Sequence, residues 1–309
     1  MRVVSLVPSL TELVWELDPE ALVGRTRFCT VPYENRRVPQ VGGTKNPDIG
    51  KIAALKPDLV IANKEENRRE DVEAMQAAGL NVLLTDPNTV DEALAMILEI
   101  GALLGCEDTA QVFADNAREV LDEPPIEPVR VFVPIWHEPL MGLGSATYGN
   151  DVLERVGAVN VFGGRERYPE VSLEEVRALQ PEVVLLPDEP FPFDLGHFRT
   201  YEAVAPRVLR VPGEWLWWYG PRISSGISGL RGLLRGEHRA KVRVVAEEEF
   251  ASESAEALLQ LAKQFAAPVV GLPTGNTPTG MYEELGRRVA VGSADISGWR
   301  PYAIDEYGG

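Results

Sequence analysis

The chain has 309 residues, which is enough for about two domains. Its formal net charge of −17 argues against a nucleic-acid partner or an anionic membrane surface, because both require clustered Lys and Arg. No apolar run is long enough to span a bilayer, so the sequence predicts no membrane insertion. Cys29 and Cys106 lie far apart and indicate no disulfide framework.

The N-terminal segment does not have the pattern of a secretory signal peptide. A strand-like run begins at residue 2, and Pro8 and Glu12 follow it too soon for an apolar leader. We therefore predict a cytoplasmic protein from this sequence. A leader outside this chain would instead predict a periplasmic or cell-surface protein.

Residues 1–105 alternate buried strand-like runs with amphipathic helices, as in a Rossmann-like α/β lobe. The expected strands lie at residues 2–7, 21–25, 59–62 and 81–85, and the expected helices at about 10–17, 68–78 and 89–104. Asn63, Lys64 and Glu66 follow the third strand, at the edge where open α/β sheets usually bind ligands. This polar run is also typical of a solvated helix start, so it has two interpretations.

A single long helix is predicted between residues 106 and 123. Its apolar stripe has helical spacing, its first turn is acidic, and Pro124-Pro125 ends it. The stripe consists of Ala110, Phe113, Ala117, Val120 and Leu121.

The sequences on the two sides of this helix repeat each other. Each copy, residues 48–62 and 172–186, reads as a short helix, a proline turn and an apolar strand. The matching positions are Leu55, Pro57 and Val60 in the first copy and Leu179, Pro181 and Val184 in the second. Two similar lobes joined by one helix would leave a cleft between them.

The second lobe is expected at residues 128–236. Its predicted strands are 129–135, 158–162, 183–186 and 208–211, and its predicted helices include 151–156, 201–205 and 224–234, with Tyr148 to Asp151 capping the first. The pattern restarts after residue 236, and residues 240–309 form a partial α/β segment. The fold class is therefore α/β: two Rossmann-like lobes joined by a single long helix, followed by this segment.

Three tryptophans and a tyrosine cluster between Gly213 and Arg222. In an extended segment, Trp215 and Trp217 would share one side and Trp218 would lie on the other. In a loop that faces a cleft these rings would form a flat platform for a ligand. A hydrophobic plug that packs the lobe is the other interpretation.

Two further sets of residues could carry chemistry. His137, beside Trp136 at a strand end, could ligate a metal axially, or it could be an ordinary surface residue. Thr274, Gly275, Asn276 and Thr277 lie between a strand and a helix, where backbone amides suit a phosphate, and Asp305 could act as a general base.

Residues 2–235 resemble the class III substrate-binding proteins of ABC transporters, and within that group the cobalamin-binding receptors. The resemblance rests on Arg2-Val-Val-Ser-Leu-Val-Pro-Ser-Leu-Thr-Glu12, Leu22-Val-Gly24, Val41, Ile52-Ala-Ala-Leu-Lys-Pro-Asp-Leu-Val-Ile-Ala62, Asp151-Val-Leu-Glu154, Val171-Ser-Leu-Glu174 and Pro221-Arg222. It implies a helical-backbone periplasmic-binding-protein fold, a bulky chelate ligand and an ABC permease as partner.

The same resemblance implies a binding site for a corrinoid, either cobalamin or cobinamide, and no catalytic cofactor. Its ligand-binding residues would be Phe28, Asn63, Trp136, Glu214, Trp215, Leu216, Trp217 and Trp218. Thr44 and Asn63 stand where the family cleft has tryptophans. Glu174 keeps an acidic residue that the family presents to its permease, and the symmetric position is Gly50. A ferric siderophore or haem is the alternative ligand.

Residues 242–309 resemble the first part of the glucosamine-6-phosphate deaminase and 6-phosphogluconolactonase group. The matching stretches are Gly271-Leu-Pro-Thr-Gly-Asn-Thr-Pro-Thr-Gly-Met-Tyr-Glu-Glu-Leu285 and Asp305-Glu-Tyr-Gly308. This resemblance implies that residues 274–277 hold a sugar phosphate and that Asp305 abstracts a proton. The later segments of that family, with its acid/base histidine, have no counterpart in this sequence. We therefore expect a binding protein, with a deaminase-like enzyme fused to a binding domain as the rival hypothesis.

Overall fold

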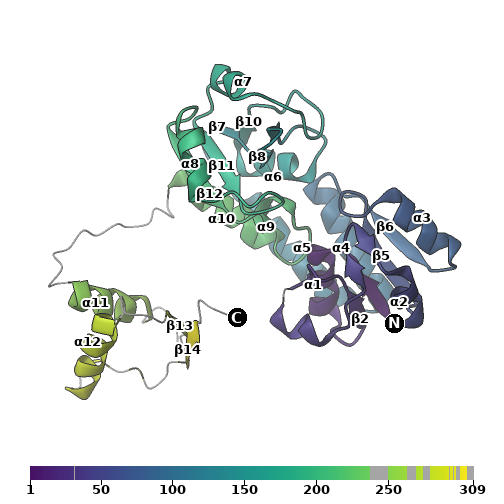
Figure 1. The fold of residues 1–309 in the computed structure, drawn as a ribbon, viewed down its shortest axis with the longest axis horizontal. Coiled ribbons are helices and arrows are strands. Elements are labelled where there is room, and N and C mark those ends of the chain that lie inside the picture. The colour runs from purple at the N-terminus through teal and green to yellow at the C-terminus, as the bar shows by residue number, and fades with distance from the viewer. Residues whose placement is uncertain are drawn as a thin grey trace. The chain divides into compact units, whose positions relative to one another are not determined.

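The computed structural model of the chain describes residues 1–30, 32–236, 250–262, 269–273, 279–291, 293–294, 296 and 300–304. The chain forms two compact units, Met1–Arg239 and Ala240–Gly309 (Figure 1). Within the described residues, no helix combines the length and the apolar character that crossing a membrane requires.

The first lobe of the larger unit is a four-stranded parallel sheet with the strand order β2-β1-β5-β6. Its strands are β1 (Val3–Ser5), β2 (Leu22–Arg25), β5 (Leu59–Asn63) and β6 (Val82–Thr85). The helices and short elements of this lobe are α1 (Pro8–Leu17), η1 (Tyr33–Arg37), the β3 (Gly42–Gly43) and β4 (Asn46–Pro47) hairpin, α2 (Ile49–Ala54), α3 (Arg69–Ala77) and α4 (Val90–Leu104).

The second lobe repeats this topology with the strand order β10-β7-β11-β12, again entirely parallel. Its strands are β7 (Val129–Phe132), β10 (Ala158–Asn160), β11 (Val183–Pro187) and β12 (Arg207–Val211). Its other elements are the antiparallel pair β8 (Pro134–Trp136) and β9 (Met141–Gly142), and the helices α6 (Tyr148–Val156), α7 (Leu173–Ala178), α8 (Leu195–Glu202), α9 (Glu214–Trp217) and α10 (Ile223–Arg235).

The predicted repeat is visible in the backbone of both lobes. Lys56 in the first lobe and Gln180 in the second occupy equivalent turns, with φ values of 49° and 48°. An arginine at the start of the first strand of each lobe holds that turn: Arg2 Nε donates to the Lys56 carbonyl and Arg130 Nε to the Gln180 carbonyl, each at 3.3 Å. Equivalent side chains therefore fix equivalent turns in the two copies.

The linking helix is α5 (Glu107–Asp122), which has the predicted bounds and lies between the two sheets (Figure 1). It packs against α4 of the first lobe and α10 of the second. Its buried residues are Ala110, Ala114 and Ala117, while the larger members of the predicted stripe are only partly buried. Small side chains let α4 approach closely: a Cβ added to Gly101 would lie 2.3 Å from the Cβ of Ala110.

The described part of the smaller unit consists of two helices and two strands. They are α11 (Phe250–Ala262), β13 (Val269–Pro273), α12 (Thr279–Ala290) and β14 (Arg300–Ile304). The strands pair in parallel, and Ala255, Leu259 and Leu285 form a small buried cluster between the helices. Thr274, Gly275, Asn276, Thr277 and Asp305 lie outside the described residues, so the predicted phosphate and base roles stay predictions.

Several expected elements differ from those observed. The predicted strand 129–135 breaks into β7 and β8 because Pro134 has no backbone N–H to donate. The helix expected at 151–156 begins at Tyr148, since the Thr147 hydroxyl caps it by accepting a hydrogen bond from the Asn150 N–H. The helix expected at 201–205 lies instead at Leu195–Glu202, where Asp194 caps its start, so residues 203–205 are outside it.

The tryptophan segment is helical, which corrects the extended arrangement considered from its sequence. Residues 214–217 form one helical turn, α9, after Pro212-Gly213 reverses the chain. In this turn, the Trp215 indole packs against Gly229 of α10, and the Trp215 backbone and Cβ lie against Gly226, where no side chain blocks them. Trp215 and Trp217 therefore do not share one side of a strand.

We predict that Gly101→Ala destabilises the larger unit by about 1 to 2 kcal/mol, although alanine is the better helix former, because the added methyl group pushes α4 away from α5. Urea unfolding followed by circular dichroism measures this change. Gly50→Ala is the matched control, since a Cβ there meets only ordinary contact at 3.5 Å. Equal stabilisation by both substitutions would contradict the close packing of α4 against α5 at Gly101.

Candidate ligand-binding cleft

A cavity of about 420 Å³ lies between the two lobes. Its walls come mainly from loops at the carboxyl ends of the strands in both sheets, which is the usual ligand edge of such sheets. The first lobe contributes Val7, Pro8, Ser9, Phe28, Thr44, Lys45, Glu65, Glu66, Pro87 and Asn88; the second contributes Ile135, Tyr148, Gly149, Tyr168, Glu189, Pro190, Leu216, Trp217, Trp218 and Tyr219.

Four of the ligand-binding residues predicted from the sequence line this cavity: Phe28, Leu216, Trp217 and Trp218. Phe28 is 51% exposed, although it is a large apolar side chain. The two indoles are held by one residue, because Trp217 Nε1 donates to the Glu189 backbone carbonyl and Trp218 Nε1 to the Glu189 carboxylate, each at 2.7 Å. Their rings are thereby fixed in the wall.

The other four predicted residues lie outside the cavity lining. Trp215 packs under α10 and serves as a plug, so the tryptophan cluster combines both interpretations of its sequence. Glu214 pairs with Arg222 at 2.5 Å. Asn63 is fully buried, and its amide binds Thr85 while its carbonyl oxygen accepts from Tyr219 Oη at 3.2 Å.

Trp136 and His137 belong to an aromatic cluster of the second lobe. Trp136 is 42% exposed and meets the Phe191 ring edge-on at 5.4 Å. His137 lies 3.4 Å from Tyr201 Oη and contacts the His197 ring, with centroids 4.8 Å apart. Among the described residues, no group of three or more His, Cys, Asp or Glu side chains could hold a metal. His137 therefore does not line the cavity, and it belongs to no candidate metal site among the described residues.

Three acidic residues line the cavity, Glu65 and Glu66 from the first lobe and Glu189 from the second, and burial raises the pKa of two of them. Burial raises the pKa of Glu66 in the first lobe, and the nearby charge of Lys45 opposes that shift. Burial also raises the pKa of Glu189 to about 7, with further contributions from Glu214, Asp188 and Glu66. Within the described residues neither of these two carboxyl groups forms an ion pair, so the cavity combines aromatic walls with carboxyl groups that have no paired cation.

Glu189 was not predicted from the sequence, but a signal for it exists. The repeat that aligns Leu55 with Leu179 also aligns Glu65 with Glu189, and both follow the corresponding strands β5 and β11. Extending the repeat past each strand would have placed both acids at the cleft. The positions of Tyr148 and Tyr168 in the cavity wall had no comparable sequence signal.

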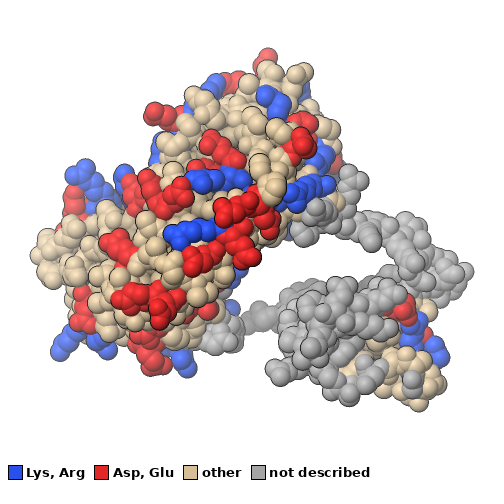
Figure 2. Space-filling model, turned by 180° about the vertical axis from the view of Figure 1, so that it is seen from behind, with Lys and Arg blue, Asp and Glu red and all other residues tan. Residues whose placement is uncertain are grey.

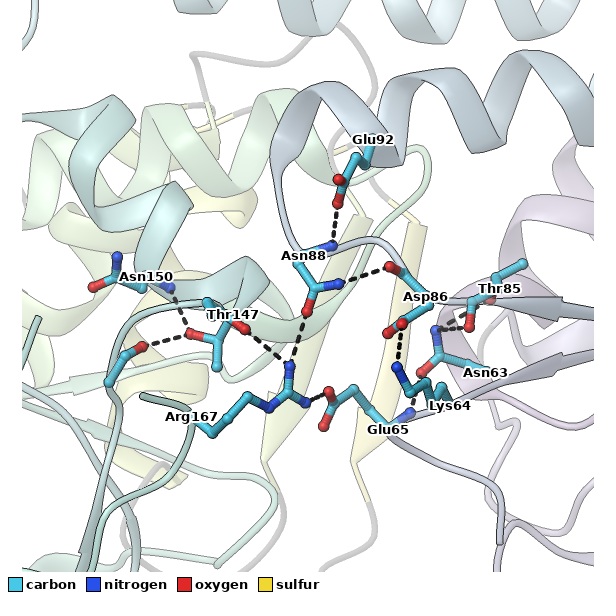
Figure 3. A network of polar contacts seen from close by, with 12 residues as sticks. Asn63, Lys64, Glu65, Thr85, Asp86, Asn88, Glu92, Thr147, Asn150 and Arg167 are labelled. Carbon is cyan, nitrogen blue, oxygen red and sulfur yellow. Dashed lines mark hydrogen bonds and ion pairs between the residues drawn. The ribbon is translucent and has the colours of Figure 1, made fainter. Parts of the chain in front are cut away.

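Polar contacts join the lobes beside the cavity. The Arg167 guanidinium of the second lobe forms an ion pair with Glu65 and donates to Asn88 Oδ1 at 2.9 Å (Figure 3). On another side, Arg222 grips the Glu12 carboxylate through Nε and Nη2, at 2.8 to 2.9 Å. Arg222 also lies over the Trp218 ring, 5.2 Å from its centre. The interface is thus tied directly to the aromatic wall.

The charges on the outer surface are mixed in sign. Figure 2 shows acidic and basic side chains interspersed on that face of the larger unit, with no broad basic patch among the described residues drawn there.

The family model described as periplasmic binding protein matches residues 3–194. The chain belongs to this periplasmic binding protein family. The vitamin B12-binding protein of Salmonella typhi is 27% identical over 235 residues, covering 72% of this chain and 85% of that protein. The vitamin B12-binding protein of Pectobacterium carotovorum is 24% identical over 231 residues, with coverages of 72% and 84%.

Solved structures confirm the fold of this periplasmic binding protein. The periplasmic vitamin B12 binding protein of Vibrio cholerae has a TM-score of 0.63 at 22% identity, covering 77% of this chain and 98% of that one. The periplasmic haem binding protein HutB of the same organism has a TM-score of 0.66 at 22% identity, with coverages of 76% and 98%. The two-lobed, helical-backbone architecture is therefore as predicted, and the family is one of binding proteins and not of enzymes.

We predict that Arg222→Ala destabilises the larger unit by about 2 to 4 kcal/mol, because it leaves the buried Glu12 carboxylate without its counter-ion. The Glu12 side chain is only 9% exposed. The double variant Glu12→Gln/Arg222→Ala should recover part of the loss. Thermal unfolding of the three proteins measures this, and an undiminished loss in the double variant would contradict the coupling.

Glu189 should make the stability of the larger unit depend on pH. A raised pKa means that the folded state disfavours ionisation. The contribution of Glu189 to the free energy of unfolding is therefore lost as the pH rises from 4.5, the ordinary pKa of the group, through about 7. Glu189→Gln, which can still accept the Trp218 hydrogen bond, should therefore be more stable than wild type by about 1 to 2 kcal/mol at pH 8 and equal to it at pH 4.5. Urea titrations at both pH values test this, and a gain at pH 4.5 alone would refute it.

Proposed function

We propose that this chain binds a corrinoid in the cavity between its lobes and presents it to an ABC transporter. The observation that carries the proposal is the composition of the cavity wall, which gathers aromatic rings from both lobes around one space. Flat, apolar walls with a few polar groups suit a flat macrocycle. The vitamin B12-binding relatives, which align with 72% of this chain, support the corrinoid as the ligand class.

The two walls have different parts in this proposal. Trp217 and Trp218 are fixed by their hydrogen bonds to Glu189, so they provide a preformed surface. Phe28 is half exposed on the opposite lobe, and a ligand between the lobes would cover it. Burying this ring against a macrocycle would supply apolar contact from the first lobe.

Haem is the second candidate ligand, and one observation favours it. Tyr168 lines the cavity, and its hydroxyl makes no hydrogen bond with any residue in the described part of the chain. A phenol is one of the known axial ligands of haem iron. A haem-bound sample would show a Soret band that Tyr168→Phe shifts, whereas a corrinoid protein would show no specific haem spectrum.

The transporter partner follows from the proposed function and the family. Glu174 lies exposed in the first turn of α7, where a carboxylate could pair with a basic residue of a permease. The equivalent position in α2 is Gly50, also exposed. We therefore propose a docking surface with one acidic anchor on the second lobe. The cytoplasmic location stays a prediction, and delivery to a permease from outside the cell membrane would place the protein in the periplasm instead.

We predict that cobinamide quenches tryptophan fluorescence saturably, because two indoles line the proposed site. Phe28→Ala should raise the dissociation constant roughly tenfold, the equivalent of about 1.4 kcal/mol of lost ring burial. Trp136→Ala removes an exposed indole outside the cavity and should leave the dissociation constant unchanged. Absence of quenching at high micromolar cobinamide would reject the corrinoid as the ligand. An equal rise of the dissociation constant in both variants would show that the binding site is not confined to this cavity.

A further inference from the structure

The geometry points to Glu66 and Glu189 as a ligand filter: the cavity admits chelates whose rim carries hydrogen-bond donors such as primary amides and rejects chelates whose rim carries carboxylates. This inference rests on the proposed function, because it assumes that a chelate occupies the cavity between the lobes. It adds the chemical property that separates the ligands this site accepts from macrocycles of similar size and shape.

The two carboxyl groups have free acceptor capacity. Within the described residues, the Glu66 carboxylate accepts no hydrogen bond and forms no ion pair. Glu189 accepts one hydrogen bond, from Trp218 Nε1, through a single oxygen. Polar groups in such a site are normally satisfied, so a bound molecule that donates hydrogen bonds on both sides would complete them.

The positive charges near the cavity form no ion pair with these two acids within the described residues, although the charge of Lys45 favours ionisation of Glu66. Of the lining residues in the described part of the chain, Lys45 alone is cationic, and its ammonium donates to the Glu65 backbone carbonyl at 2.8 Å. Arg167 is paired with the Glu65 side chain. Glu65 is thereby neutralised, whereas Glu66 and Glu189 form no ion pair within the described residues, and Glu189 is ionised only above its pKa of about 7. A carboxylate rim would meet repulsion from both lobes.

The charged and titratable groups around each acid determine the pH at which the filter should be tested. Glu189 faces Asp188, Glu214 and Glu66, which are all acidic. Glu66 faces Lys45 and lies near the phenols of Tyr168 and Tyr219. Since the pKa of Glu189 is about 7, the filter is expected to be sharpest at pH 8.

A matched pair of probes tests the filter: dicyanocobinamide, whose rim carries amides, and dicyanocobyrinic acid, which has the same corrin ring and axial ligands with carboxylates instead. Calorimetric titration of the full chain at pH 8 should show at least about a hundredfold preference for the amide ligand. Glu66→Gln/Glu189→Gln should reduce this preference at least about tenfold, mainly by tightening the binding of the acid. Glu119→Gln, on the exposed face of α5, removes one charge far from the lining and should change nothing.

The possible outcomes separate this inference from the proposed function. If the wild type binds both corrins equally, or if the double variant keeps the full preference, the filter is refuted while the corrinoid site stands. If the wild type binds neither corrin, the proposed function fails and the filter fails with it. Circular dichroism confirms that the variants are folded, and the Glu189→Gln side chain can still accept the Trp218 hydrogen bond through its amide oxygen.

Discussion

The ion pair between Glu12 and Arg222 is the contact on which the cleft depends. Glu12 comes from the first helix of one lobe and Arg222 from the start of the last helix of the other. A carboxylate as buried as that of Glu12 requires a partner, and Arg222 supplies it through two nitrogens. The same guanidinium binds Glu214 and covers the Trp218 ring, so the lobe interface and the cavity wall are held by one side chain.

The internal repeat explains why a cavity forms at this interface. Both lobes are parallel sheets with the same strand order, and the loops that follow their strands face a common space. Such loops cannot continue the sheet, so their side chains are available to a ligand. Each copy also places a glutamate shortly after its equivalent strand. In the first copy Glu65 is neutralised by Arg167. In the second copy Glu189 accepts one hydrogen bond from Trp218 and has no ion-pair partner within the described residues.

The sequence predicted the features that depend on periodicity and repetition. The helix at residues 107–122, the two copies around Leu55 and Leu179, and the two similar α/β lobes were predicted from spacing and repetition, and the structure confirms them. Trp217 and Trp218 were among the predicted site residues, and both line the cavity.

What the sequence did not predict depends on the direction of individual side chains in irregular segments. Trp215 and Trp217 look alike in the sequence, yet one turn of helix sends the first onto the glycines of α10 and the second to the cavity wall. Asn63 stands at a strand end, but its amide and carbonyl are used internally by Thr85 and Tyr219. These outcomes depend on tertiary partners that lie far away in the chain.

The central claim is that one corrinoid sits between the two lobes, and the cobalt atom offers the most direct test. Crystals grown with cobinamide and measured near the cobalt absorption edge would locate the metal by its anomalous signal. We predict one strong peak in the cavity between Phe28 and Trp217. A peak beside Trp136 and His137, or an empty cavity in crystals that contain the ligand, would contradict it.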